Sequence, residues 1–457
     1  MNFITPIMIL TASLAAQPDE VVALKVGRAI TVTGKEIEKA VIVMEGGTIK
    51  AIGSDVEIPR TARVVDMPRA VAMPGIVDAH SVNGLRLSNE RLANVPYVSV
   101  LDGIDPSSPG LRNALRHGVT SIHCIAGNVT RFGGQGAVIR TSGKTVTELV
   151  VKAPSAMKLS LQPASGENRM GNMAALRKTF YDFYTRMKAI QETGGQAPLV
   201  DRKKLSLTDL VNTRPSWGEI DWKKVPHDKV SERDRPMRSL VKGELRAFIN
   251  CPTASDVFKA FELIDSNHID ATLVLGPDAW KLGDVLAVRK NLGPVVLNPL
   301  LEVWDRDDET GAEKRHITPV LLHKAGISFA LQVFTDTSFN KGPYFGRSGP
   351  YHHWYQAAKL VQYGMPRDKA LETITMIPAK LLRLDHRLGS LEVGKDANIA
   401  IFSGDPLDAR SWVERVFIEG REVYDRGKDR DIERLLKDPE RPFRDGAAQT
   451  GSANEET

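Results

Sequence analysis

The stretch from residue 72 to residue 85, AMPGIVDAHSVNGL, holds the residues best placed by type and spacing to do chemistry. A Pro-Gly turn leads into the apolar pair Ile76 and Val77, and Asp78 and His80 follow before an Asn-Gly stop. This pattern predicts a short buried strand with polar side chains at its carboxyl end. In a (β/α)8 barrel, active-site chemistry lies at that end of the strands.

Two further acidic candidates follow turns and strand-like runs. Glu167 stands in the turn SGENR, and Asp336 follows an apolar run in FTDTS. Each candidate also has a structural interpretation. His80 could hydrogen-bond to a backbone carbonyl, and Asp78 or Glu167 could orient a turn. Asp336 could cap the segment that follows it. The residues alone leave both interpretations open.

The spacing of apolar residues along the chain changes twice. Residues 21–66 alternate between apolar and polar residues and are divided by glycine turns, which predicts a small antiparallel sheet. From residue 74, apolar runs alternate with amphipathic segments, which predicts βα units around a parallel sheet. Alternating strands return from residue 413. Short sheets at both ends of a chain need each other to bury one face, so the two ends should form one composite domain.

Several of these segments resemble motifs of a known family. PGIVDAHS resembles the first barrel strand of the amidohydrolase superfamily, P-G-[L/I]-[I/V]-D-x-H-x-H, and GSLEVGKDANIAIF resembles its closing segment. GGQGAVIR and SGENRMG are similar to turns of the imidazolonepropionase-like branch. The resemblance covers residues 21–426. It implies an α/β fold, with a (β/α)8 TIM-like barrel and a small composite β-sandwich domain formed by the N- and C-terminal segments.

This resemblance sets the expected domain boundaries. Residues 17–73 and 387–427 are the two halves of the β-sandwich, and residues 74–386 are the barrel. Within the barrel, residues 196–243 are rich in Lys, Arg, Asp and Pro, which predicts a mobile insertion. Residues 428–457 are charged and are predicted to form a disordered tail.

The resemblance also implies a chemistry. The superfamily hydrolyses amide and related C–N bonds with one or two divalent metal ions, which activate a bound water and polarise the scissile carbonyl. His80 matches the first histidine of the family's first strand. Asp336 matches the aspartate of the eighth strand, which serves as metal ligand and general base. Other positions where the family usually has histidines hold different residues: Val82, Asn250, Pro252 and Leu275.

The implied metal site is therefore incomplete. His80 and Asp336 remain as ligands for a zinc-type divalent ion, whereas a catalytic zinc site has about three protein ligands. Asp336 is the catalytic candidate. Asp78, Glu167 and Asn250 are the candidates to line a substrate pocket.

Three functions fit these residues. The first is a hydrolase acting on C–N bonds other than peptide bonds, with a degenerate metal site and weak or altered activity. The second is a non-catalytic relative that binds a small-molecule ligand or partners an active paralogue. The third is a lyase or isomerase with a metal-free pocket. Convergence of His80, Glu167 and Asp336 on one open pocket would favour chemistry. A pocket filled by apolar side chains at the replaced ligand positions would favour binding.

Composition and charge limit the kinds of partner that the protein is expected to bind. The net charge is +5, and Lys and Arg are scattered without a basic stripe, so nucleic acid is not an expected partner. Residues 1–16 are apolar and end in small residues, which predicts a signal peptide and a secreted or periplasmic protein. No later stretch is long and apolar enough to span a membrane.

Cys124 and Cys251 are expected to be buried thiols. Barrels of this family often form homodimers, and a homodimer is one assembly that the resemblance allows, although the sequence shows no interface signature.

Overall fold

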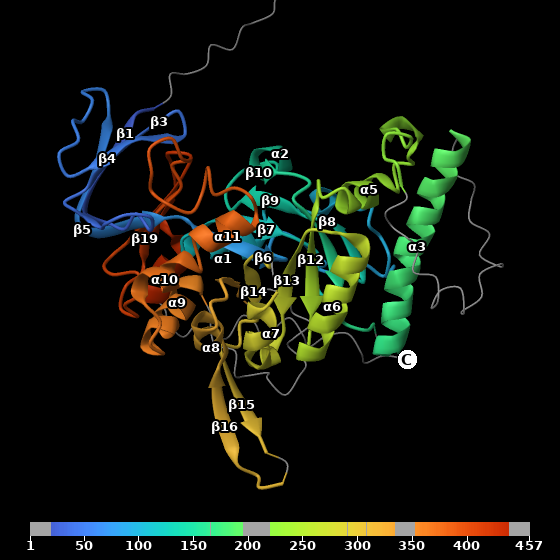
Figure 1. Ribbon diagram of the computed structural model, residues 1–457. Coiled ribbons are helices and arrows are strands. Elements are labelled where there is room, and N and C mark those ends of the chain that lie inside the picture. The colour runs from blue at the N-terminus through green and yellow to red at the C-terminus, as the bar shows by residue number, and fades with distance from the viewer. Residues whose placement is uncertain are drawn as a thin grey trace, which may run out of the picture.

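The computed structural model describes residues 20–164, 166–194, 220–289, 291–307, 309–333 and 352–437. Figure 1 shows a β domain at one end of the molecule and, beside it, a barrel whose strands are flanked by helices. The predicted α/β fold, a TIM-like barrel with a composite β-sandwich domain, is confirmed. The predicted signal peptide, residues 196–219, Asp336 and residues 438–457 lie outside the described residues.

The β domain joins the two ends of the chain in one hydrogen-bonded sheet. Its strands are β1 (Val22–Ala29), β2 (Ile37–Glu38), β3 (Val41–Glu45), β4 (Thr48–Gly53), β5 (Arg63–Pro74), β18 (Ile399–Phe402), β19 (Val413–Ile418) and β20 (Arg421–Asp425). Their order is β20-β19-β18-β5-β1-β3-β4, with β2 paired to β1. Leu24 and Ile42 from one end pack in the same buried cluster as Ile399 and Phe417 from the other. Each half therefore depends on the other to bury its apolar face.

The barrel wall has eight strand positions around its circumference. The strands are β6 (Ile76–Ser81), β7 (Val119–Cys124), β8 (Phe132–Gln135), β9 (Ala137–Arg140), β11 (Ala156–Ser160), β12 (Arg246–Cys251), β13 (Ala271–Leu275), β14 (Val295–Leu297) and β17 (Phe329–Leu331), with β8 and β9 sharing one position. The strands from β11 through β14 to β17 run parallel in sequence order. β17 lies beside β6, where the wall closes.

The third position of the wall differs from the expected parallel arrangement. β9 pairs antiparallel with β7, and β8 pairs antiparallel with β11, so this segment runs against its neighbours. The physical reason is the short connection of residues 125–131 between β7 and β8. A parallel crossover needs about a dozen residues or more, whereas an antiparallel return needs only a few.

Helices and one hairpin cover the barrel. The helices are α1 (Pro109–Arg116), α2 (Val146–Leu149), α3 (Arg169–Thr193), α5 (Arg235–Val241), α6 (Ala254–Asn267), α7 (Gly283–Ala287), α8 (Thr318–Lys324), α9 (His353–Gln362), α10 (Arg367–Glu372), α11 (Met376–Leu381) and α12 (Arg430–Lys437). The hairpin of β15 (Glu302–Arg306) and β16 (Glu313–Ile317) projects at the bottom of Figure 1. A search of the described helices finds none with the length and apolar character needed to cross a membrane.

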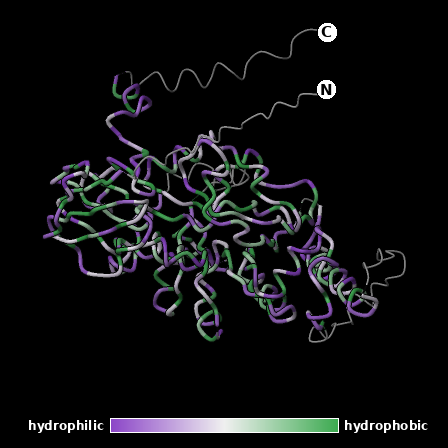
Figure 2. Tube along the Cα trace, turned by 90° about the horizontal axis from the view of Figure 1, so that it is seen from above, coloured by the Kyte–Doolittle hydropathy of each residue, from purple (hydrophilic) through white to green (hydrophobic). Residues whose placement is uncertain are grey.

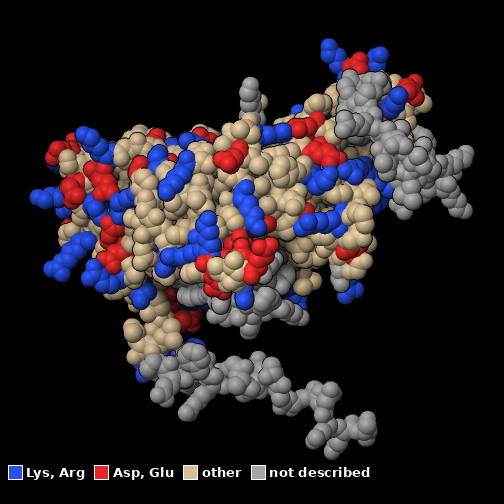
Figure 3. Space-filling model, turned by 60° about the horizontal axis from the view of Figure 1, so that its bottom comes forward, with Lys and Arg blue, Asp and Glu red and all other residues tan. Residues whose placement is uncertain are grey.

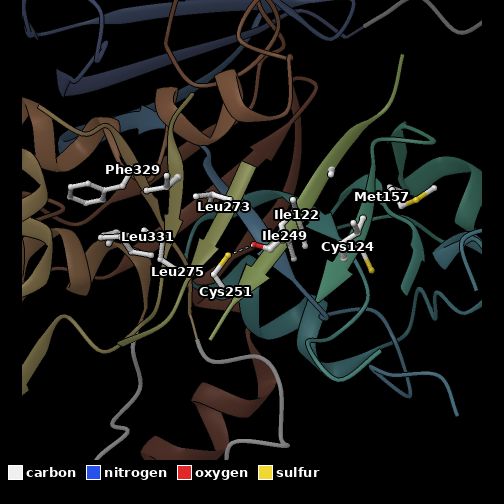
Figure 4. Close-up of a cluster of buried hydrophobic side chains, with 14 of the residues drawn as sticks. Ile122, Cys124, Met157, Ile249, Cys251, Leu273, Leu275, Phe329 and Leu331 are labelled. Atoms are coloured by element: carbon white, nitrogen blue, oxygen red, sulfur yellow. Dashed lines mark hydrogen bonds between the residues drawn. The ribbon is translucent and has the colours of Figure 1, made fainter. Parts of the chain in front are cut away.

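Barrel strands bury both faces, as the apolar runs of the sequence require. One cluster fills the interior and includes Val77, Val138, Phe248, Val274 and Ala330. A second cluster packs the outer face against the helices. Figure 4 shows part of it, with Ile122, Cys124, Met157, Ile249, Cys251, Leu273, Leu275, Phe329 and Leu331. Figure 2 likewise shows hydrophobic residues running through the middle of the molecule.

Part of the predicted insertion is packed rather than mobile. Residues 220–243 include helix α5 and the buried side chains of Val225, Val230, Met237 and Leu240, which belong to the main core cluster. These residues were not expected to pack because the segment is rich in charged residues and its apolar residues are widely spaced in the sequence.

Charged side chains of both signs are interspersed over the face of the molecule in Figure 3.

The start of the predicted tail is also ordered, because Arg116 of α1 binds the segment before α12. Nε of Arg116 donates to Oδ2 of Asp429 at 2.6 Å, and Nη2 donates to Oδ1 at 2.7 Å. Asp431 accepts a further hydrogen bond from Nη2. A bidentate pair of this kind fixes geometry as well as adding stability.

We expect Arg116→Ala to lower the free energy of unfolding by about 1 kcal/mol, because the pair is only partly shielded from solvent. Amide hydrogen exchange of residues 429–437 should become faster, measured by mass spectrometry. Arg112→Ala, which removes an exposed arginine of the same helix, is the control. Equal exchange in the two variants would show that Arg116 does not hold this segment.

Candidate functional site

A cavity of about 330 Å³ opens at the carboxyl end of the barrel strands. Its polar lining comes from β6, β12, the loops after the strands and the start of α3: His80, Asn128, Gln162, Arg169, Asn250, Thr253, Asn298 and Gln332. Val82, Pro252 and Leu275 line it as well, so three of the replaced histidine positions face this space. The cavity thus lies where the sequence predicted a site, and its wall is mostly uncharged.

His80 lies in this wall on β6 and is 6% exposed. Its Nε2 is 2.6 Å from Nζ of Lys158. An ammonium group can only donate, so Nε2 accepts and the proton of the neutral ring lies on Nδ1. Burial lowers the pKa of His80 well below its usual value, and the nearby charges of Lys158 and His123 lower it further. His80 is therefore a neutral hydrogen-bond acceptor for a buried cation.

Lys158 is the residue that sequence reasoning missed. It is the middle residue of β11, AMKLS, and its side chain is fully buried. Its ammonium also donates to Oδ1 of Asn128 at 2.6 Å. Burying an ammonium is costly unless acceptors surround it, and His80 and Asn128 supply two. The signal was a lysine within a strand whose other residues are all apolar or small.

Asn250, one of the candidates for a substrate pocket, lines the cavity from β12. Its side chain is 5% exposed, and its Nδ2 donates to Oγ of Ser160 on the neighbouring strand at 3.1 Å. Oγ of Ser160 in turn donates to the backbone carbonyl of Asn128. This chain of contacts fixes the carboxamide of Asn250 at the cavity wall.

Asp78 does not line the cavity, contrary to the expectation for it. It is 1% exposed, its Oδ1 lies 3.6 Å from Nε2 of His353 on α9, and it accepts the backbone N–H of His80 at 3.2 Å. Residues two apart in a regular strand face the same side. The register of β6 against β7 shifts between Asp78 and Ser81, and this irregularity separates Asp78 from His80.

Glu167, which stands just before α3, is also absent from the cavity lining, because its carboxylate pairs with Arg131. Arg131 is 5% exposed and donates through Nε to Oδ1 of Asn172 at 2.7 Å. The neighbouring Asn168 caps α3 by accepting the N–H of Gly171 at 3.0 Å. These contacts match the structural interpretation of SGENR as a turn that begins a helix.

Arg169, the first residue of α3, is the charged side chain that reaches the cavity from this turn. Its Nη2 donates to Oγ1 of Thr253 at 2.7 Å, and its Nε lies 3.4 Å from Oδ1 of Asp256. The side chain is 52% exposed. Sequence reasoning chose Glu167 from SGENR as a pocket candidate and passed over Arg169, the arginine that ends the same motif.

No group of three or more His, Cys, Asp or Glu side chains within the described ranges is placed to hold a metal ion. Cys124 and Cys251 are buried free thiols, and burial raises the pKa of Cys124 to about 12. The buried thiols were predicted correctly, and they are inert at neutral pH. Asp336, the predicted catalytic residue, stays a prediction because it lies outside the described residues.

Several buried histidines make stability depend on pH. Burial lowers the pKa of His123 to about 3 and that of His352 to about 4. Below about pH 6.5 the unfolded chain binds protons that these folded rings do not. Stability is therefore fully present above pH 6.5 and falls as the pH decreases toward 4.

We expect urea unfolding of the wild type to show this loss between pH 7 and pH 5. His123 is fully buried, and its Nδ1 lies 2.9 Å from the carbonyl oxygen of Ala79. His123→Asn keeps a donor but cannot titrate, so it should reduce the slope by up to about 1.4 kcal/mol per pH unit. An unchanged slope would assign the pH dependence to other groups.

Comparison with known proteins gives related sequences and folds. The family model described as "Amidohydrolase family" matches residues 332–424. A curated relative, amidohydrolase tasK of Hapsidospora irregularis, is 24% identical over 420 residues, which cover 84% of this chain and 40% of the relative. The chain therefore spans less than half the length of that protein.

A solved structure extends the likeness to the fold. The crystal structure of an amidohydrolase from Thermotoga maritima superposes with a TM-score of 0.71 at 26% identity, covering 89% of this chain and all of the other. The barrel, the composite β domain and the motifs at both ends of the chain agree with these likenesses. The family expected from PGIVDAHS and GSLEVGKDANIAIF is thus confirmed, and the chain belongs to the amidohydrolase superfamily.

Proposed function

We propose that the protein is a hydrolase acting on C–N bonds other than peptide bonds, with a degenerate metal site and weak or altered activity. The observation that carries this proposal is the contact between Lys158 and His80 at the wall of an open cavity. Family membership supports the reaction class, and the cavity supports a small-molecule substrate. The replaced ligands support the altered activity.

The residues present do not fit the divalent metal that the superfamily usually binds. Nε2 of His80 is the atom that would ligate, and the Lys158 ammonium lies 2.6 Å from it. A divalent cation there would face a positive charge at close range in a shielded site. Val82, Pro252 and Leu275 offer it no ligand atom. The reaction is therefore not routed through a metal ion.

This chain's own groups can position an amide substrate without it. The carboxamides of Asn128, Asn250 and Gln332 lie in the cavity wall, where donors can hydrogen-bond to a carbonyl oxygen. Asp336 follows the cavity residue Val333 closely in sequence and is the proposed base that activates water. Attack of this water on the carbonyl carbon breaks the C–N bond, and the proton taken by Asp336 passes to the leaving amine.

A non-catalytic binding protein is the second candidate. The apolar side chains at the replaced ligand positions favour it, because they line the cavity without filling it. Such a site keeps the volume to hold a small molecule while lacking the usual hydrolytic groups.

Metal analysis and a hydrolysis screen test the two candidates together. Protein purified without chelators should contain well below one equivalent of zinc, manganese or iron, before and after reconstitution. Slow hydrolysis of cyclic amides or N-acyl amino acids, abolished by Asp336→Ala, would support the hydrolase. One equivalent of metal that is lost in His80→Ala would contradict the degenerate site. Absence of all hydrolysis would favour the binding protein.

A further inference from the structure

The hairpin of β15 and β16 has two open edges. It projects from the barrel in Figure 1, and its strands pair from Glu302–Ile317 at the base to Arg306–Glu313 near the turn. Within the described part of the chain, neither strand pairs with a third strand. A two-stranded hairpin alone is only marginally stable in water, and an open strand edge can pair with another chain. The hairpin is therefore a candidate interaction surface.

The outer edge of β15 is formed by the backbone of Glu302, Trp304 and Arg306. At the end of the strand, the N–H of Asp307 donates to the carbonyl of Ala312 at 2.9 Å, so Asp307 faces the partner strand. The backbone polar groups of an antiparallel strand point alternately to its two sides. The N–H and carbonyl groups of the three even-numbered residues therefore point away from β16.

These three residues are complementary to a second copy of themselves. Their side chains share one face of the hairpin, Trp304 is 53% exposed, and Arg306 is exposed as well. Two β15 strands paired antiparallel about Trp304 would place Glu302 of each copy against Arg306 of the other. The two Trp304 rings would lie between these charge pairs. Both backbone hydrogen bonds of each pair can form, because the backbone groups of these residues point outward.

The carboxylate of Glu302 is already held in position at this edge. Its Oε2 accepts hydrogen bonds from Nη2 of Arg315 at 2.6 Å and from the hydroxyl of Tyr363 at 2.9 Å. A carboxylate can accept several hydrogen bonds, so it keeps capacity for an arginine of another chain. Arg306, in contrast, has no carboxylate partner within the described ranges. A second copy would supply one.

The order of the charges selects one arrangement. Charged residues on an open edge often prevent pairing with other chains, and a parallel pair of β15 strands would indeed bring two Glu302 side chains together. The antiparallel pair instead joins opposite charges. The outer edge of β16 lacks this property, because antiparallel pairing about Arg315 would join two arginines and set Glu313 against Ile317. Of the two edges, that of β15 matches itself.

The base of the hairpin has room for the second copy. A cavity of about 400 Å³ lies beside it, with Leu301, Trp304 and Lys359 of α9 in its wall. In an antiparallel pair, the turn of each hairpin lies beside the base of the other. This turn carries the exposed carboxylates of Asp307 and Glu309, which have the opposite charge to Lys359.

We infer that two copies of this chain pair through β15, antiparallel about Trp304, so that their hairpins form one four-stranded sheet. The pair has two-fold symmetry, which is the commonest symmetry of homodimers. One strand edge buries less surface than the roughly 1,600 Å² of a standard interface, so the dimer is weak. We expect a dissociation constant on the order of 10–100 µM. Sedimentation equilibrium of the purified protein measures it.

Charge reversal at Arg306 tests the pairing. Arg306→Glu would place two glutamates together at each end of the contact, so it should weaken dimerisation by at least about tenfold. Lys314→Glu is the matched control, because it makes the same change of charge at an exposed residue of β16, away from the β15 edge. It should change the dissociation constant by less than about twofold.

A mixture of two variants tests the register. Glu302→Arg would join two arginines at each end of the contact and should also be monomeric. Mixed in equal amounts with Arg306→Glu, it restores both Glu–Arg pairs, so the mixture should associate as the wild type does. Circular dichroism checks that each variant is folded. If loss of the contacts to Arg315 and Tyr363 unfolds Glu302→Arg, the comparison of Arg306→Glu with Lys314→Glu still decides.

Three results would each overturn the inference. The first is a wild-type protein that stays monomeric up to about 1 mM, which would leave this edge to a different partner. The second is a dimer that Arg306→Glu and Lys314→Glu weaken equally. The third is a mixture of the two folded charge variants that does not associate.

Discussion

Replacing His80 with alanine is expected to lower the free energy of unfolding at pH 7 by about 3 kcal/mol. The side chain of Lys158 is fully buried, and His80 accepts one of its hydrogen bonds at 2.6 Å. Without the imidazole, the ammonium still donates to Asn128 but loses the acceptor nitrogen of His80 in a fully buried position. The loss of a hydrogen-bond acceptor by a buried ammonium therefore lowers stability more than the empty space left by the imidazole would on its own.

A second substitution distinguishes this charge effect from simple loss of packing. Lys158→Met keeps similar length and removes the ammonium, so we expect it to cost less than His80→Ala. The double variant His80→Ala with Lys158→Met should be more stable than His80→Ala alone by about 2 kcal/mol, because it has no buried ammonium that has lost a hydrogen-bond acceptor. Urea unfolding of the four proteins at pH 7 gives the coupling energy. Additive effects would mean that the two side chains do not depend on each other.

The same variants report on the pKa of His80. In Lys158→Met this pKa should rise, because a positive charge beside the ring is removed. It should stay below the usual value, since burial, the larger cause, remains. Histidine-labelled NMR titration, assigned with His80→Ala, measures it. An unchanged pKa would show that Lys158 is not charged beside His80.

The fold was largely predictable because its signals are local. Alternation at both ends of the chain predicted the composite β domain, and the apolar runs from residue 74 onward predicted barrel strands such as β12 and β13. The direction of β9 was not predicted, since a short connection decides it and an apolar run has no direction. An apolar run shows where a strand lies, whereas the length of the connection before it decides whether the strand pairs parallel or antiparallel.

The site was less predictable because it depends on which side each residue faces. His80 and Asn250 line the cavity, but a register shift in β6 turns Asp78 toward His353. Lys158 was overlooked because a lysine in an apolar strand gives no sign of its partner, which lies far away in sequence. Register and long-range pairing are properties of the assembled barrel, so they become visible only in three dimensions.

The second large effect is expected at Gly276, where two strand ends meet beside the cavity. A Cβ at this position would lie 2.0 Å from the carbonyl oxygen of Pro252 and 2.6 Å from its carbon. The φ of Gly276 is −76°, which any residue adopts, so the cost of Gly276→Ala comes from the contact and not from the backbone conformation. Backbone atoms cannot rotate away as a side chain can. We expect a loss of about 3 kcal/mol in the free energy of unfolding.

Gly283→Ala is the matched control for this prediction, because Gly283 opens α7 close by and its added Cβ would meet Ala325 at an ordinary 3.4 Å. Alanine there should be neutral or stabilise by up to about 1 kcal/mol, since it favours the helix. Urea unfolding compares the two variants. Equal stability of the two variants would mean that the loops after β12 and β13 separate easily, and the cavity wall between them would then be adjustable rather than fixed.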